Sequence, residues 1–217
     1  MKHYKYIFWD LDGTISDSAF GIVNATSYAL EQMGTEIADR EQLKKFVGPP
    51  LLESFSKYFG YTPEQGERAV NLFRDYYQRQ GIDENWIYPD IADLLEKLQA
   101  DGRINVIATS KPEVHARTIL ERYGIDRFFY YIAGSTFEET RTRKDEVIAY
   151  ALETCGITDT AQVIMIGDRA HDCIGARLNG IDCIGVLYGY GDREELEEAG
   201  AIAIAKDIHE LTELLLK

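Results

Sequence analysis

Two aspartates separated by a single residue follow the first apolar run of the sequence. Asp10 and Asp12 belong to the segment Asp10-Leu11-Asp12-Gly13-Thr14, which comes directly after residues 6–9. Two carboxylates in one loop repel each other unless one is protonated or a cation lies between them. Such a pair could supply a nucleophile and a general acid/base, or two contacts to a metal ion. A solvated turn is the ordinary alternative, because aspartate and glycine favour turns.

A second acidic segment follows another apolar run. Gly167, Asp168 and Asp172 come after residues 163–166. Further carboxylates at the end of a second strand suit a hard divalent cation, since Mg²⁺ prefers carboxylate oxygens, water and phosphate to nitrogen or sulfur. A role for Asp168 as the N-cap of the next helix would explain its position without a metal.

Polar and basic residues stand at two further positions where helices are predicted to begin. The segment Thr109-Ser110-Lys111-Pro112 follows residues 104–108, and a hydroxyl with free backbone N–H groups at a helix start forms an anion site. Simple capping, with the proline in the first turn, is the alternative. Arg141, Arg143 and Lys144 precede another helix, where positive charge is unfavourable. An anionic ligand would explain this cluster, and an exposed basic turn is the alternative.

The runs that precede these residues predict the elements that position them. They are short, nearly continuous and rich in β-branched and aromatic residues, at 6–9, 104–108, 128–133, 163–166, 183–187 and, more weakly, 201–204. Segments with helical periodicity alternate with them, at 91–98, 114–123, 147–152 and 211–215. This alternation predicts an α/β fold with a doubly wound, Rossmann-like parallel sheet. Because such sheets bind ligands at their carboxyl edge, the polar segments are expected to meet there.

One region interrupts this alternation. Residues 16–81 contain no strand-like run, only helical patterns broken by glycine and proline. We therefore expect two domains, an α/β core formed by residues 1–15 and 82–217 and a small helical domain, residues 16–81, inserted after the first strand.

The composition excludes several classes of protein. The chain has 217 residues, 37 acidic and 23 basic side chains and a net charge of −14, which argues against binding to nucleic acid or to an anionic membrane. No apolar run reaches the roughly 18 residues of a transmembrane helix. Cys155, Cys173 and Cys183 are too few for a disulfide framework, so we expect Cys173 to be a free thiol and the protein to be cytoplasmic.

Taken together, the polar segments resemble the four motifs of the haloacid dehalogenase-like superfamily. The resemblance spans the whole chain, and residues 16–81 look like the small helical cap of that family. In chain order the matching residues are Asp10-Leu11-Asp12-Gly13-Thr14, Thr109, Lys144, and Gly167-Asp168 with Asp172.

The resemblance implies a role for each aspartate. Asp10 would be the nucleophile that forms an aspartyl-phosphate, and Asp12 the general acid/base. Mg²⁺ would be held by an Asp10 carboxylate oxygen, the Asp12 backbone carbonyl and Asp168. Asp172 would orient metal-bound water or Lys144. An aspartate at position 12 also favours phosphoester hydrolysis, because family members that cleave carbon–halogen bonds typically lack it.

The resemblance likewise implies the phosphate site and the substrate. Thr109, the Ser110 backbone N–H and Lys144 would hold the phosphoryl oxygens. The segments 46–51, 108–112, 167–172 and 185–191 look like those of phosphoglycolate phosphatases and their 5′-nucleotidase-like branch. Two residues depart from phosphoglycolate phosphatases, in which Asn is common at the position of Ser110 and Ser at that of Arg169.

The function implied is magnesium-dependent hydrolysis of a small phosphomonoester, either a nucleoside 5′-monophosphate or a phosphoglycolate-like compound. An enzymatic alternative is a sugar-phosphate mutase similar to β-phosphoglucomutase, which returns the phosphoryl group to its substrate. A non-enzymatic alternative is a receiver-like signalling domain with a phosphorylated aspartate. The sequence carries no signal for the oligomeric state.

Overall fold

The computed structural model describes residues 2–137 and 141–216, and the chain divides into two compact units. One unit is Asp17–Trp86, and the other contains the described residues before and after it. Strands β2 (Ser16–Asp17) and β3 (Trp86–Ile87) form a two-stranded sheet where the chain passes from one unit to the other.

The larger unit is built on a six-stranded sheet in the order β5-β4-β1-β6-β7-β8. Its strands are β1 (Tyr6–Trp9), β4 (Ile104–Pro112), β5 (Phe129–Ser135), β6 (Val163–Gly167), β7 (Asp182–Val186) and β8 (Ala203–Ala205). Every neighbouring pair is parallel. The predicted doubly wound α/β fold is therefore confirmed.

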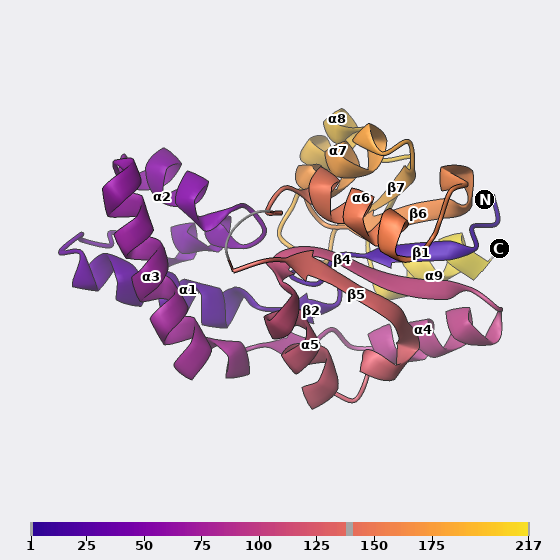
Figure 1. Cartoon of the computed structure of the whole chain (residues 1–217), viewed down its shortest axis with the longest axis horizontal. Helices are drawn as coiled ribbons and strands as arrows, with labels where there is room; N and C mark the ends of the chain where they lie inside the picture. The colour runs from indigo at the N-terminus through magenta and orange to yellow at the C-terminus, as the bar shows by residue number, and fades with distance from the viewer. Residues whose placement is uncertain (1, 138–140, 217) are drawn as a thin grey trace. The chain divides into compact units, whose positions relative to one another are not determined.

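Helices cover both faces of this sheet (Figure 1). One face carries α6 (Lys144–Thr154), α7 (Ala170–Leu178) and α8 (Arg193–Ala199). The other carries α4 (Ile91–Ala100), α5 (Glu113–Arg122) and α9 (Ile208–Leu216). The short 3₁₀ turns η3 (Asp126–Phe128) and η4 (Thr160–Gln162) precede β5 and β6. None of the helices in the described part of the chain is long and apolar enough to cross a membrane.

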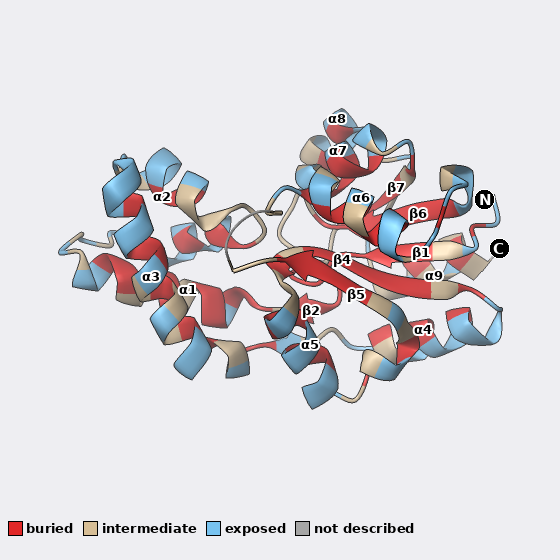
Figure 2. Cartoon of the chain, in the orientation of Figure 1, coloured by how far each residue is buried: buried red, intermediate tan, exposed pale blue. Residues whose placement is uncertain are grey.

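The central strands β1 and β6 are almost entirely apolar because both of their faces are covered (Figure 2). Phe8, Val106 and Met165, from three neighbouring strands, have none of their surface exposed and belong to one core cluster. Val147 and Ala151, four residues apart on α6, join the same cluster. This spacing places both side chains on one helix face, which packs against the sheet.

The strand order places β1 at the switch point of the sheet. From β1 the chain builds β4 and β5 on one side, and then β6, β7 and β8 on the other. Trp9 at the end of β1 is level with Ile107 of β4 and Ile166 of β6. The residues that follow this level therefore lie together at the carboxyl edge, the usual ligand site of open α/β sheets, although β4 itself continues through Pro112.

The smaller unit is helical and has an aromatic core. Its elements are α1 (Ala19–Gln32), η1 (Arg40–Phe46), α2 (Leu51–Phe59), α3 (Pro63–Arg79) and η2 (Gly81–Asp83). Helix α3 begins with a capping box, in which the Thr62 hydroxyl accepts from the Gln65 N–H and the Gln65 side chain accepts from the Thr62 N–H. Phe46 and Phe55 are buried and pack edge to face, with ring centroids 4.9 Å apart.

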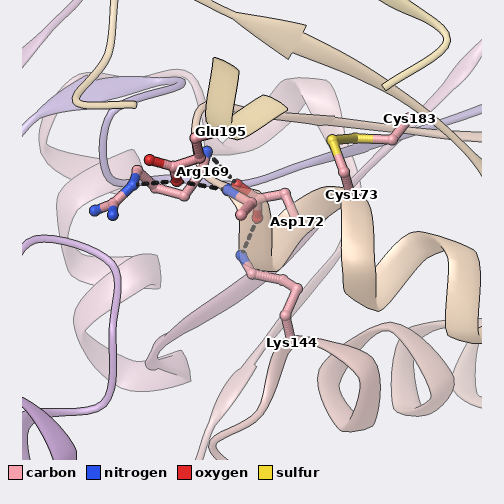
Figure 3. The surroundings of a disulfide bond; sticks show 7 residues. Lys144, Arg169, Asp172, Cys173, Cys183 and Glu195 are labelled. Carbon is pink, nitrogen blue, oxygen red and sulfur yellow. Dashed lines mark hydrogen bonds and ion pairs between the residues drawn. A yellow bond between two sulfur atoms is a disulfide. The ribbon is translucent and has the colours of Figure 1, made fainter. Parts of the chain in front are cut away.

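The structure corrects two expectations. Residues 109–112 do not open a helix, because β4 continues through Pro112 and α5 begins at Glu113. Cys173 is not a free thiol, because it forms a disulfide with Cys183, and the two Cα atoms are 5.2 Å apart (Figure 3). Cys173 lies on α7 and Cys183 on β7, and only Cys155 is free among the cysteines.

Phe8 tests the packing of the central strand. We expect Phe8→Ala to lower the free energy of unfolding by about 3–5 kcal/mol, because the lost ring leaves a cavity between the sheet and its helices. Tyr130→Ala on the edge strand is the control, since 68% of Tyr130 is exposed, and it should cost less than about 1 kcal/mol. Urea unfolding measures both values. Equal losses would contradict the assignment of β1 to the core.

Candidate active site

Three buried carboxylates converge at the carboxyl edge of the sheet. Asp10 follows β1, Asp168 follows β6, and Asp172 lies in the first turn of α7. One oxygen from each carboxylate lies within 4.8 Å of the other two. All three residues are buried, and Asp168 has no exposed surface. The structure thus brings together carboxylates that the sequence predicted at two separate strand ends.

The buried Lys144 pairs with two of these three carboxylates. Lys144 Nζ lies 2.7 Å from Asp10 Oδ1 and 2.8 Å from Asp172 Oδ1, and it donates to the Ala108 carbonyl at 3.1 Å. These three partners match the three donors of an ammonium group. Burial alone would lower the pKa of Lys144, but the charges of Asp10 and Asp172 outweigh it and raise this pKa. Lys144 is therefore charged at neutral pH.

One lysine does not balance three carboxylates. Burial raises the pKa of Asp10 to about 6, with Lys144 opposing the shift and Asp172 adding to it. Burial also raises the pKa of Asp168 well above its usual range, and the charges of Asp172 and Asp10 add to this shift. The cluster therefore carries an excess of negative charge that favours either a proton or a cation.

The backbone lies so close to the Asp168 side chain at two positions that only glycine fits there. A Cβ atom at Gly13 or at Gly189 would overlap the Asp168 carboxylate, and Gly13 has a φ of 86°. The Tyr190 N–H donates to Asp168 Oδ2 at 2.8 Å. Asp168 Oδ1, by contrast, is buried and has no hydrogen-bond partner among the described residues. An acceptor left in this state is costly unless a ligand satisfies it.

A hard divalent cation fits this arrangement. The cluster offers carboxylate oxygens, excess negative charge and, at Asp168 Oδ1, an oxygen without a hydrogen-bond partner in the described part of the chain, all of which suit Mg²⁺. Asp10 and Asp168 are the side chains best able to hold the ion. Asp172 is already engaged, because it pairs with Lys144 and its Oδ2 accepts from the Arg169 N–H at 3.1 Å.

Asp12 has a partner that sequence reasoning missed. Lys111 Nζ donates to both oxygens of the Asp12 carboxylate, at 2.9 and 2.8 Å. Lys111 occupies β4, and its backbone N–H donates to the Thr109 hydroxyl at 3.2 Å. Residues two apart on a strand share a face, so a strand assignment would have placed Lys111 beside Thr109. Thr109 itself is buried, and Ser110 between them is half-buried.

The basic residues before α6 do not gather around one anion. The Arg141 guanidinium lies 3.5 Å from the centre of the Tyr150 ring, and Arg141 Nε donates to the Gly134 carbonyl at 3.0 Å. Arg143 is exposed and pairs with Asp145 at 3.0 Å. Of the three residues, only Lys144 reaches the carboxylate cluster.

Arg169 and Glu195 tie the start of α7 to α8 (Figure 3). Arg169 Nε and the Ala170 N–H both donate to Glu195 Oε1 at 2.7 Å. Because Gly189 and Tyr190 lie in the loop that precedes α8, this contact stabilises the segment that encloses Asp168. Glu195 stands in an acidic run of the sequence, where nothing distinguishes it from the solvent-exposed glutamates beside it.

Similarity to known proteins decides the family. Residues 7–186 match the family described as haloacid dehalogenase-like hydrolase. The chain belongs to this family. It is 39% identical over 98% of its length to a 5′-nucleotidase of Pseudomonas aeruginosa, of which it covers 96%. It is also 35% identical over 97% of its length to the tyrosine-protein kinase PtkA of Mycobacterium tuberculosis, of which it covers 72%.

A solved structure agrees with this assignment. The crystal structure of a predicted phosphatase from Clostridium acetobutylicum is 41% identical, covers 99% of each chain and has a TM-score of 0.96. The family and these relatives identify the protein as a phosphoric monoester hydrolase, as the sequence motifs predicted.

Asp168→Asn tests the charge balance of this hydrolase. In metal-free protein we expect the variant to be more stable than wild type by about 1–2 kcal/mol, because it removes one of three crowded buried carboxylates. MgCl₂ should raise the unfolding temperature of wild type but not that of the variant. Calorimetry with and without chelator measures both effects.

Asp207→Asn is the matched control, because the Asp207 side chain is 50% exposed and lies just before α9, where asparagine can accept from the Glu210 N–H as aspartate does. It should change neither the metal-free stability nor the response to MgCl₂. A full response to MgCl₂ in Asp168→Asn would contradict the metal site.

Proposed function

We propose that this hydrolase cleaves a small phosphomonoester with the help of Mg²⁺ through a covalent intermediate on Asp10. The observation that carries the proposal is the carboxylate cluster of Asp10, Asp168 and Asp172, held by Lys144 and including an Asp168 oxygen without a partner in the described residues. An excess of buried negative charge has no structural benefit, but it does provide a nucleophile and ligands for a cation.

The chain's own residues account for both halves of the reaction. A carboxylate oxygen of Asp10 attacks phosphorus, the ester P–O bond breaks, and the leaving oxygen takes a proton from Asp12. A water molecule then attacks phosphorus and gives a proton to Asp12, and the bond between phosphorus and Asp10 breaks. The net reaction consumes the ester and water and releases an alcohol and inorganic phosphate.

The remaining residues bind and orient the phosphoryl group. Asp10, the Asp12 backbone carbonyl and Asp168 would hold Mg²⁺, whose charge stabilises the phosphoryl oxygens in the transition state. Thr109, the Ser110 N–H and Lys144 would contact the other oxygens. Because Lys144 already has three partners, a phosphoryl oxygen there would replace the neutral one, the Ala108 carbonyl.

The substrates that we place first are nucleoside 5′-monophosphates. The support is the name of the 39% identical relative, a 5′-nucleotidase. Phosphoglycolate-like esters come second, since Ser110 and Arg169 depart from the residues common in phosphoglycolate phosphatases. We propose that the helical unit Asp17–Trp86 serves as the cap that selects among these esters, because the phosphoryl site itself is common to all of them.

A substrate panel with site variants tests the proposal. We expect inorganic phosphate to be released from at least one nucleotide or small phosphomonoester, and chelation of Mg²⁺ to abolish the release until the ion is restored. Asp10→Asn should lower kcat on the order of 10³-fold or more, because it removes the nucleophile. Asp207→Asn should leave kcat unchanged.

Three outcomes would contradict the proposal. Turnover that survives Asp10→Asn excludes covalent catalysis at Asp10. An isomerised ester without free phosphate indicates a mutase, and a phosphoryl group found on a tyrosine peptide indicates transfer to protein rather than hydrolysis.

A further inference from the structure

The Asp12 carboxylate has a cation of its own. Lys144 pairs with Asp10 and Asp172, whereas Lys111 donates to Oδ1 and Oδ2 of Asp12 at 2.9 and 2.8 Å. The two residues of this pair are 99 positions apart in the sequence, so the fold alone brings them together. The two lysines therefore pair with different carboxylates, Lys111 with Asp12 and Lys144 with Asp10 and Asp172.

This second pair is buried, so it constrains Asp12 strongly. The side chains of Lys111 and Asp12 are only 5% and 10% exposed. A buried ion pair is weakly screened by solvent, and removal of one partner leaves the other charge uncompensated. An ammonium group that contacts both oxygens also restricts rotation of the carboxylate about its Cβ–Cγ bond. Lys111 thus fixes where the Asp12 oxygens point.

Lys111 is itself held by the irregular end of β4. The pairing of β4 with β5 shifts register between Ala108 and Pro112. Within this stretch the Lys111 N–H donates to the Thr109 hydroxyl. A Cβ atom at Gly134 of β5 would lie only 2.7 Å from the Lys111 carbonyl oxygen, so a glycine allows the close approach. The strand that carries Thr109 thereby also places the lysine that orients Asp12.

We propose that Lys111 is a positioning residue for Asp12. Lys111 sets the direction in which Asp12 gives its proton to the leaving oxygen. The inference rests on the proposed function, in which the ester P–O bond breaks as Asp10 attacks phosphorus and the leaving oxygen takes the proton of Asp12. One Asp12 oxygen points toward the leaving oxygen while the other remains on Lys111. Lys111 contributes through Asp12 and not through the substrate.

The leaving group provides the test. A good leaving group such as p-nitrophenolate departs without a proton, whereas an alkoxide needs one. The ratio kcat/KM covers the steps up to release of this first product, so it reports the proton transfer for each ester. We therefore compare kcat/KM in saturating MgCl₂ for p-nitrophenyl, phenyl and alkyl phosphates.

We expect Lys111→Met to lower kcat/KM by at least about 10-fold for alkyl phosphates and by less than about 3-fold for p-nitrophenyl phosphate. The dependence on leaving-group pKa should steepen, as it should in Asp12→Asn. Lys111→Arg should restore part of the loss, because it keeps a cation beside Asp12. If the methionine variant does not fold, Lys111→Gln gives the same test. Its side-chain NH₂ group can still donate to Asp12, so the loss in kcat/KM should be smaller.

A double variant separates positioning from substrate binding. If Lys111 acts through Asp12, then Lys111→Met should cause no further loss in an Asp12→Asn background. Lys206→Met is the matched control, because the Lys206 side chain is 70% exposed, and it should change none of these values. A uniform loss for all three esters, or an additional loss in the double variant, would overturn the inference.

The Asp12→Asn variant distinguishes failure of the proposed function from failure of this inference. If Asp12→Asn itself leaves the leaving-group dependence unchanged, then Asp12 is not the acid and the proposed function fails together with this inference. If Asp12→Asn steepens the dependence and Lys111→Met does not, only the role of Lys111 is wrong.

Discussion

Repulsion among buried carboxylates is the constraint on which this candidate active site depends. Asp10, Asp168 and Asp172 approach within 4.8 Å of one another, and one lysine partly balances their charge. A divalent cation would complete the balance, and the same positive charge would attract the phosphate of a substrate. The net charge of −14 is therefore compatible with an anionic substrate, since the local charge at the site decides binding.

The sheet topology makes this crowding unavoidable. Strand β1 lies between β4 and β6 at the switch point, so Asp10 after β1 and Asp168 after β6 lie side by side, next to the end of β4 that carries Thr109 and Lys111. Glycines at 13 and 189 let the backbone close around Asp168, and the pair of Arg169 with Glu195 holds the second of these loops to α7. Lys111 then pairs with Asp12, and Lys144 pairs with Asp10 and Asp172.

The sequence predicted the sheet well because buried parallel strands are continuous apolar runs. Asp10 and Asp168, which follow two of those runs, lie together with Asp172 in the structure, whereas Asp12 pairs with Lys111. The prediction that residues 109–112 open a helix was wrong. Proline favours an extended conformation in the residue before it, so β4 continues through Pro112. The pairs Lys111–Asp12 and Cys173–Cys183 depend on tertiary neighbours that no local pattern indicates. The cytoplasmic location stays a prediction.

The central claim is that the crowded cluster makes Asp10 a nucleophile. The most direct measurement is a rapid acid quench of enzyme turning over its substrate with MgCl₂, followed by peptide mapping with mass spectrometry. The account predicts one phosphoryl group, located on Asp10, that appears and decays on the timescale of turnover. Turnover with no phosphorylated enzyme, or with the phosphoryl group on another residue, would contradict it.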